Sequence, residues 1–182
     1  MSNARNLANL LGTGTTVPSA KMPSGSVLQV KQAVITGTFS TSSTSFVDVT
    51  GLTVSITPSS SSNKILVIGN CQVIGGDAGG GYTILRGSTE IYRGDADGSR
   101  QRFSVTNTYA RSDSANYYSG GASQAIFLDS PGTTSSTTYK IQAKIRATAL
   151  YIGRTNYDLD NDNASRNPSS ITVMEIANWV IL

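Results

Sequence analysis

The order of apolar and polar residues along the chain predicts β-strands through most of its length. Three early segments alternate between the two classes with a period of two residues, as strands with one buried face do: residues 27–35, 46–49 and 52–56. A more continuous run of β-branched and other apolar residues, 64–74, predicts a strand buried on both faces or in a sandwich core. Both patterns indicate a sheet protein.

A hairpin and further strands follow at spacings typical of antiparallel folds. Residues 82–85 and 89–92 flank the short connection Arg86-Gly87-Ser88, which predicts a hairpin. We expect the remaining strands at residues 102–109, 125–128, 139–147, 150–154 and 171–182. About ten strands separated by Gly, Ser and Thr turns, with no convincing internal helix, predict an all-β, antiparallel β-sandwich of jelly-roll-like type.

The first 25 residues have a different pattern. Residues 2–11 place several apolar residues on one face of a short helix, namely Ala4, Leu7, Ala8, Leu10 and Leu11. The following segment contains Pro18 and Pro23 and offers the helix no regular partner. Because so short a helix is marginal alone in water, it is expected either to dock on another protein or to fray. We therefore divide the chain into an extended N-terminal arm carrying a short helix, residues 1–25, and a β-domain, residues 26–182.

Composition narrows the classes of function. Of the 182 residues, 38% are apolar and only 14% are charged, while Ser and Thr occupy 47 positions, which favours sheets with polar loops. The formal net charge is +3 and Lys and Arg never cluster beyond a pair, so nucleic-acid binding is not expected. No apolar stretch is long enough for a membrane span or a signal peptide. The single Cys71 lies in an apolar run and is expected to be buried.

The chain lacks the usual residues of catalytic and metal sites. It contains no histidine, which removes the commonest general base and most zinc sites. Asp158, Asp160 and Asp162 alternate as at the opening of a calcium loop, but Asn163 and Ser169 stand where the turn glycine and the bidentate glutamate are needed. Loop carboxylates could cleave glycosides, yet no pair can be identified. We therefore expect no enzyme activity, no cofactor and no metal ion.

Candidate recognition residues lie in the long loops, the usual location of binding residues on a β scaffold. Tyr117, Tyr118 and Tyr157 lie in or beside such loops, where a rigid ring can stack on a ligand and its hydroxyl can form a hydrogen bond. Arg154, Asp158 and Asp160 lie close to Tyr157 in sequence and could orient a sugar. The alternative is that these rings pack back over the sheet. The other aromatic residues, Tyr92 and Phe103 among them, are expected to be half-buried on strands.

Several motifs resemble segments of the tail fibres and other virion proteins of aquatic (marine or cyanobacterial) tailed bacteriophages. At the N-terminus these are SNARNLANLLG at 2–12, PSAKM at 18–22 and GSVLQV at 25–30. In the body they are SNKILV at 62–67, TYKIQA at 138–143 and SITVMEI at 170–176, which resemble small jelly-roll modules of those fibres. Together these segments span most of the chain.

The resemblance implies a virion structural protein of fibre or appendage type, made in the host cytoplasm and located in the phage particle. Its arm would attach it to other virion proteins through Asn3, Arg5, Leu7, Leu10 and Leu11. Its β-domain would form a homotrimer, which would also cover apolar outer strands such as 171–176, and would contact a host-surface glycan or protein. Because no shaft accompanies the arm, a capsid decoration protein of cement or head-fibre type is the alternative.

Overall fold

A computed structural model of the chain describes residues 22–75, 79–106, 108–109 and 122–178. The regular elements among these residues are all strands. The described residues contain no helix long and apolar enough to cross a membrane. In chain order the strands are β1 (Val27–Ile35), β2 (Phe39–Thr41), β3 (Val47–Ile56), β4 (Lys64–Gly75), β5 (Gly80–Arg86), β6 (Thr89–Tyr92), β7 (Val105–Thr106), β8 (Thr108–Tyr109), β9 (Ala122–Asp129), β10 (Thr137–Ile145), β11 (Leu150–Ile152) and β12 (Ser169–Ile176).

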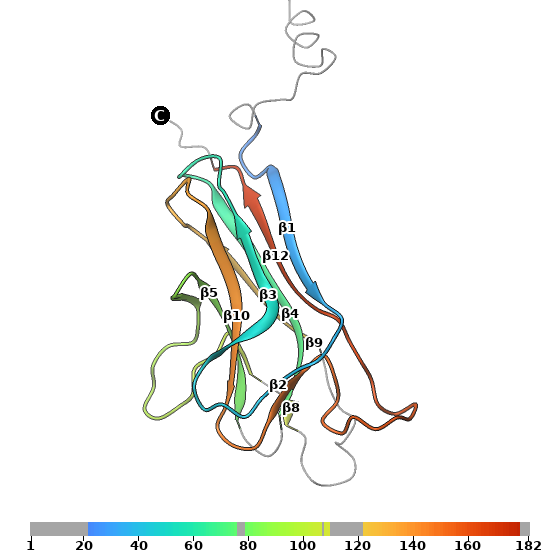
Figure 1. Cartoon of the computed structure of the whole chain (residues 1–182). Helices are drawn as coiled ribbons and strands as arrows, with labels where there is room; N and C mark the ends of the chain where they lie inside the picture. Colours follow the sequence, from blue (N-terminus) through green and yellow to red (C-terminus); the bar gives the residue numbers. More distant parts are fainter. Residues whose placement is uncertain (1–21, 76–78, 107, 110–121, 179–182) are drawn as a thin grey trace, which may run out of the picture.

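The strands form two sheets that lie as two layers (Figure 1). The seven-stranded sheet has the order β1-β12-β4-β11-β2, and both β9 and β8 also pair with β4. The five-stranded sheet has the order β3-β10-β5-β6, with β7 paired to β5. All of these pairs are antiparallel except the short β4–β8 pair. The prediction of an all-β protein with antiparallel sheets is therefore confirmed.

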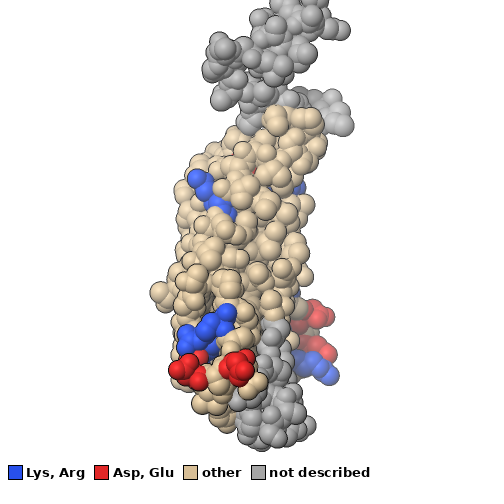
Figure 2. Space-filling view, turned by 90° about the vertical axis from the view of Figure 1, so that its right-hand side faces the viewer, with Lys and Arg blue, Asp and Glu red and all other residues tan. Residues whose placement is uncertain are grey.

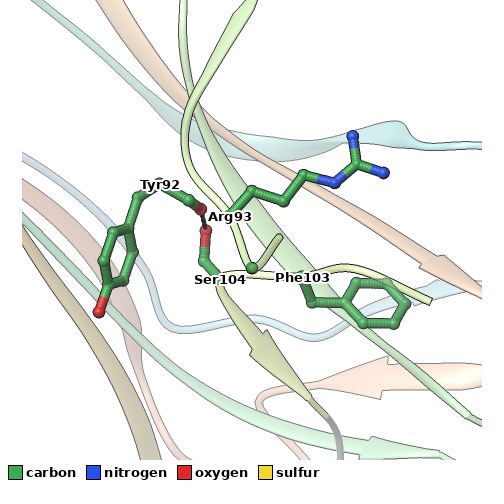
Figure 3. Close-up of a pocket in the computed structure, with 5 residues that line it drawn as sticks. Tyr92, Arg93, Phe103 and Ser104 are labelled. Carbon is green, nitrogen blue, oxygen red and sulfur yellow. Dashed lines mark hydrogen bonds between the residues drawn. The ribbon is translucent and has the colours of Figure 1, made fainter. Parts of the chain in front are cut away.

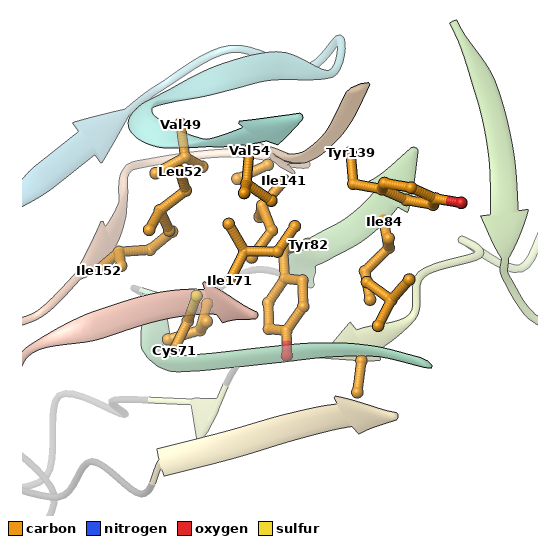
Figure 4. Close-up of a cluster of buried hydrophobic side chains, with 14 of the residues drawn as sticks. Val49, Leu52, Val54, Cys71, Tyr82, Ile84, Tyr139, Ile141, Ile152 and Ile171 are labelled. Atoms are coloured by element: carbon orange, nitrogen blue, oxygen red, sulfur yellow. The ribbon is translucent and has the colours of Figure 1, made fainter. Parts of the chain in front are cut away.

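One hydrophobic core fills the space between the two sheets. Strand β10 alternates strictly between buried and partly exposed residues, so that Tyr139 and Ile141 point into the core from the five-stranded sheet. Ile171 and Cys71 point into it from the seven-stranded sheet (Figure 4). Burial raises the pKa of the Cys71 thiol to about 12, so this residue acts as a small core side chain, as predicted.

Polar side chains tie the two sheets together at buried positions. The hydroxyl of Tyr82, on β5, lies 3.0 Å from the carbonyl oxygens of both Gly69 and Ser123 in the opposite sheet. Nearer the end of the same layer, Asp129 on β9 accepts hydrogen bonds from Arg86 at 2.8 Å and from the Tyr139 hydroxyl at 2.7 Å. Burial and this carboxylate both raise the pKa of Tyr139, which keeps its hydroxyl a donor. These contacts satisfy polar atoms that would otherwise be buried without partners.

The segments predicted at 46–49 and 52–56 form one strand, β3, which bends at Gly51. The φ angle of Gly51 is +87°, in the left-handed region that favours glycine, and the register between β3 and β10 shifts at this bulge. A Cβ atom at Gly51 would lie only 2.6 Å from Cγ2 of Ile35. Here β3 has three more residues than β10, and this odd number lets both Val49 and Leu52, three positions apart, face the core. The two segments therefore alternate with opposite phase in the sequence.

The run predicted at 64–74 is buried on both faces over only part of its length. In the first part of β4, Ile65 and Val67 face the core, while Leu66 and Ile68 face outward and are partly exposed. Only the last five residues of β4, 71–75, are all buried. The structure thus favours the second of the two predicted arrangements for this run, a strand with one face in a core.

Other boundaries differ in smaller ways. The hairpin is confirmed, because Arg86 of β5 pairs with Thr89 of β6. The strand predicted at 102–109 is instead two short strands, β7 and β8, which belong to different sheets. The last strand begins at Ser169 and ends at Ile176, earlier than the sequence pattern predicts. Strand β2 was not predicted.

The chain enters and leaves the domain at the same end, which we call the terminal end. There the backbone N–H of Gly25 donates to the carbonyl of Ala177 at 2.8 Å, and the N–H of Ala177 donates to the carbonyl of Ser26 at 2.9 Å. At the opposite end, which we call the loop end, β1 finishes and β12 starts, with Ile35 paired to Ser169. Figure 1 shows the long connection 153–168 at this loop end, away from the start of β1 and the end of β12.

Candidate functional site

Two aromatic and two basic side chains meet on the five-stranded sheet towards the loop end. Phe46, just before β3, and Phe103, just before β7, contact each other edge to face with ring centroids 5.8 Å apart. The ammonium group of Lys144, on β10, lies 4.8 Å from the Phe46 centroid and 5.6 Å from the Phe103 centroid. Arg93 approaches the Phe46 ring at 5.8 Å. We call these four residues the cation–aromatic cluster.

A pocket of about 280 Å³ lies beside this cluster. It is lined by two members of the cluster and three neighbours: Tyr92, Arg93, Gly94, Phe103 and Ser104 (Figure 3). The Ser104 hydroxyl donates to the carbonyl of Tyr92, which holds the two segments of the pocket wall together. Tyr92 is 37% exposed as a residue, and its ring stacks on Phe127 of β9 with centroids 5.3 Å apart, so its orientation is fixed by the opposite sheet.

The shape of the pocket depends on close backbone packing at Gly81. A Cβ atom there would lie 2.1 Å from the carbonyl oxygen of Val105 and 2.9 Å from Phe103. Any larger residue at Gly81 would displace the segment that presents Phe103 to the pocket. Strand β7 can therefore pair with β5 only because position 81 has no side chain.

The pocket is more basic than acidic. Arg93 forms an ion pair with Glu90, and its Nε is buried with no hydrogen-bond partner among the described residues. Arg102 donates from its Nε to the carbonyl of Gly94 at 2.6 Å. Aromatic faces beside N–H donors are the groups that proteins use to hold a sugar ring or another polar ring with acceptor oxygens. The arrangement is suited to binding such a ligand.

The predicted recognition residues 154–160 occupy the connection between β11 and β12 at the loop end. The Asp158 carboxylate accepts two hydrogen bonds from Arg166, at 2.9 and 2.7 Å, and lies 4.0 Å from Arg154. The guanidinium of Arg154 stacks over the Tyr151 ring at 3.7 Å. Arg154 and Asp158 therefore hold the loop in shape, with part of their hydrogen-bonding capacity used inside it.

Tyr157 and Asp160 remain accessible on the same loop. The Tyr157 side chain is 44% exposed, and its backbone carbonyl accepts a 2.8 Å hydrogen bond from the buried Thr155 hydroxyl. Asp160 is exposed. No group of three or more Cys, Asp or Glu residues in the described part of the chain is placed to hold a metal ion.

The remaining predicted site residues lie outside the described residues. They are the loop residues Tyr117 and Tyr118 and the arm residues Asn3, Arg5, Leu7, Leu10 and Leu11.

Sequence reasoning did not single out the cation–aromatic cluster or the pocket beside it. Tyr92 and Phe103 were assigned to ordinary packing on strands, and Lys144 is one of several alternating polar residues on β10. The cluster joins positions from 46 to 144, and only the pairing of β3, β5 and β10 brings them together. No protein-family model matches the chain, and no curated protein matches it.

Proposed function

We propose that this protein is a structural component of a bacteriophage virion, of the fibre or appendage type. Its N-terminal arm joins other virion proteins, and its β-domain, a jelly-roll-like sandwich present in three copies, contacts a glycan or protein on the host surface. The observation that carries the proposal is the separation of the two ends of the domain. The arm joins the domain at the terminal end, while the pocket and the Tyr157 loop lie towards the loop end.

The chemistry towards the loop end supports binding rather than catalysis. The pocket is lined by Phe103, Arg93 and Tyr92, and the Tyr92 ring points away from the other two and stacks on Phe127 (Figure 3). The Ser104–Tyr92 hydrogen bond and the Arg93–Glu90 ion pair hold the two ends of the connection between β6 and β7 that carries Arg93 and Phe103, which limits the conformational entropy lost when a ligand binds. Recognition residues on a rigid β scaffold are the usual arrangement for a surface-binding module.

Binding of the purified full chain to arrayed bacterial surface polysaccharides tests the recognition part of the proposal. We expect Arg93→Gln and Tyr157→Ala each to weaken the binding about tenfold, because each removes an oriented contact group. Arg100→Gln is the matched control: it removes a guanidinium from the same loop, but one that is 74% exposed and paired with Asp97. Equal losses for Arg93→Gln and Arg100→Gln would show that only net charge matters and would contradict a role for the pocket.

The place of the protein in the particle is tested separately. Antibodies against the β-domain, viewed by negative-stain electron microscopy on intact virions, should label the tail or its appendages. Label spread over the head would support the capsid decoration alternative. Virions that carry no label and no copy of the chain by mass spectrometry would contradict both.

A further inference from the structure

One face of the seven-stranded sheet is apolar and points away from the core. Four neighbouring strands, β1, β12, β4 and β9, build it, and their register aligns its side chains in rows. The first row consists of Val30, Met174, Leu66 and Leu128, and the second of Gln32, Thr172, Ile68 and Ile126. Val30, Leu128 and Ile126 are 51%, 52% and 53% exposed. We call this surface the outer apolar face; Val27 and Val34 extend it along β1.

The two rows of this face contain no charged residue. Their two polar residues form a hydrogen bond with each other, in which the Gln32 side-chain amide donates to the Thr172 hydroxyl at 2.8 Å. Lys64 lies at the margin near the terminal end, where its ammonium group donates to the Ser130 hydroxyl at 2.7 Å. Figure 2 shows the side of the molecule that faces right in Figure 1: uncharged residues cover most of its upper and middle parts, and charged residues gather towards the loop end. A partner can therefore cover the face without burying an unpaired charge.

The exposed area of the face equals that of the largest apolar patch on a typical single-copy protein, and such patches are often functional. Its half-exposed and partly exposed aliphatic side chains present roughly 500 Å² of apolar surface per copy, in the range where patches mark interfaces. Two such surfaces together bury about 1,000 Å², the lower bound for a specific protein interface, and three copies bury about 1,500 Å² in total. A second copy of the chain offers a face of equal area, with the same absence of charge.

We propose that the outer apolar face is the surface through which copies of this chain associate, with three copies arranged around a threefold axis and their faces turned inward. Four strands spaced about 4.8 Å apart make a face roughly 19 Å wide. Three such faces, set as the sides of a triangle, leave about 5.5 Å between each sheet and the axis. One layer of side chains needs about 5 Å, half the usual 10 Å between stacked sheets. Three copies therefore fill the axis with aliphatic side chains and leave no channel.

The choice of three copies rather than two rests on the proposed function, in which the β-domain is a homotrimer; the choice of surface rests on the face itself. Inward-facing sheets bring the β1 side of one copy against the β9 side of the next. With parallel copies the three arms leave at the same end, as attachment to a single site on a particle requires.

The mass of the purified full chain in solution, measured by light scattering at micromolar concentration, gives the first test. We expect three times the 19.1 kDa of one chain for the native protein and a single-chain mass for the Ile126→Lys/Leu128→Lys double variant. Leu159→Lys is the matched control, because Leu159 is equally exposed, at 50%, but lies in the loop between β11 and β12. It should remain trimeric. A native protein of one or two chains would overturn the proposal, as would a trimer that the double variant leaves intact.

Cysteine cross-linking tests the arrangement without disturbing the charge of the face. Val30→Cys and Leu128→Cys lie in the same row but about 14 Å apart within one copy, too far for a disulfide. Between neighbouring copies they would meet, and the native Cys71 is fully buried. Oxidation of the double variant should give covalent dimers and trimers and nothing larger. Dimers alone, or no cross-link in a folded protein, would overturn the threefold arrangement. Both tests use isolated protein, so their outcome does not depend on where the chain lies in a virion.

Discussion

Glu175 is a buried carboxylate held by hydrogen bonds from three residues. It is 1% exposed and accepts bonds of 2.6 Å from Gln29 and from Asn63, and bonds of 2.6 and 2.8 Å from the backbone and hydroxyl of Ser59. Burial opposes the charged form and alone would raise the pKa, but these bonds outweigh it and lower the pKa below its ordinary value of 4.5. The carboxylate thus fastens the loop after β3 to β1 and β12 at the terminal end.

The Glu175→Gln variant should unfold more easily than the native protein at pH 7, by about 3 kcal/mol, because the new amide NH₂ faces donors that the carboxylate accepted. The pH dependence follows from the lowered pKa. A carboxyl group with a lower pKa in the folded state stabilises the fold above the unfolded-state pKa, and this stability is lost as the pH falls through the folded value. Denaturant unfolding at pH 7 and at pH 4 should therefore show a larger acid-induced loss for the native protein than for the variant.

Asp48→Asn provides the comparison. Its side chain is 53% exposed and is held by Lys140 and Gln142, so solvent screens its contacts and the change should cost about 0.5 kcal/mol. Equal unfolding free energies for Glu175→Gln and the native protein at pH 7 would show that the carboxylate contributes nothing to the fold.

Among the strands, β3 depends on the conformation of a single glycine. Gly51→Ala should lower the free energy of unfolding by about 2 kcal/mol, because alanine is strained at a φ of +87° and its Cβ would meet Ile35. Gly37→Ala is the control: a Cβ at Gly37 meets no atom within 4 Å, and its unfolding free energy should change by less than about 0.5 kcal/mol. Similar values for the two variants in urea unfolding would contradict a special role of the bulge.

Most strands could be predicted because alternation is a local property of the sequence. The hairpin at Gly87 and the strand Val27–Ile35 need only neighbouring residues to be recognised. The bulge at Gly51 was missed because a change of phase looks the same as a gap between two strands. Strand β2, Phe39–Thr41, was missed because three residues are too few to establish a period. The sequence left open whether Leu66 and Ile68 face inward or outward, since an apolar residue in a core and one in an interface have the same side chain.

In the candidate site, too, what depends on neighbouring residues could be predicted, and contacts between distant strands could not. The presence of Arg154 and Asp158 in one loop could be expected, because they are close together in the sequence. The meeting of Phe46, Phe103 and Lys144 could not, because it depends on how distant strands pair. Sequence alone also could not show that Asp158 is bound by Arg166.

For the whole molecule, the position of the two chain ends has a mechanical consequence. The start of β1 and the end of β12 lie side by side at the terminal end, so a force that pulls these two points apart would open this ladder one hydrogen bond at a time. A force between the N-terminus and the loop end instead pulls β1 and β12 along their length in opposite directions. Their hydrogen bonds then carry the load together. The second geometry is the one that a domain held by its arm and attached at its loops would experience in flowing water.

Single-molecule stretching can compare the two directions. Handles on both chain ends should unfold the domain at a several-fold lower force than handles on the N-terminus and on a cysteine introduced by Asn161→Cys in the exposed loop. Equal forces would show that the β1–β12 ladder does not carry the load. A higher force in the second direction would show that the domain resists load along the line from its arm to its loops. It would also show that the domain opens easily when the start of β1 and the end of β12 are pulled apart.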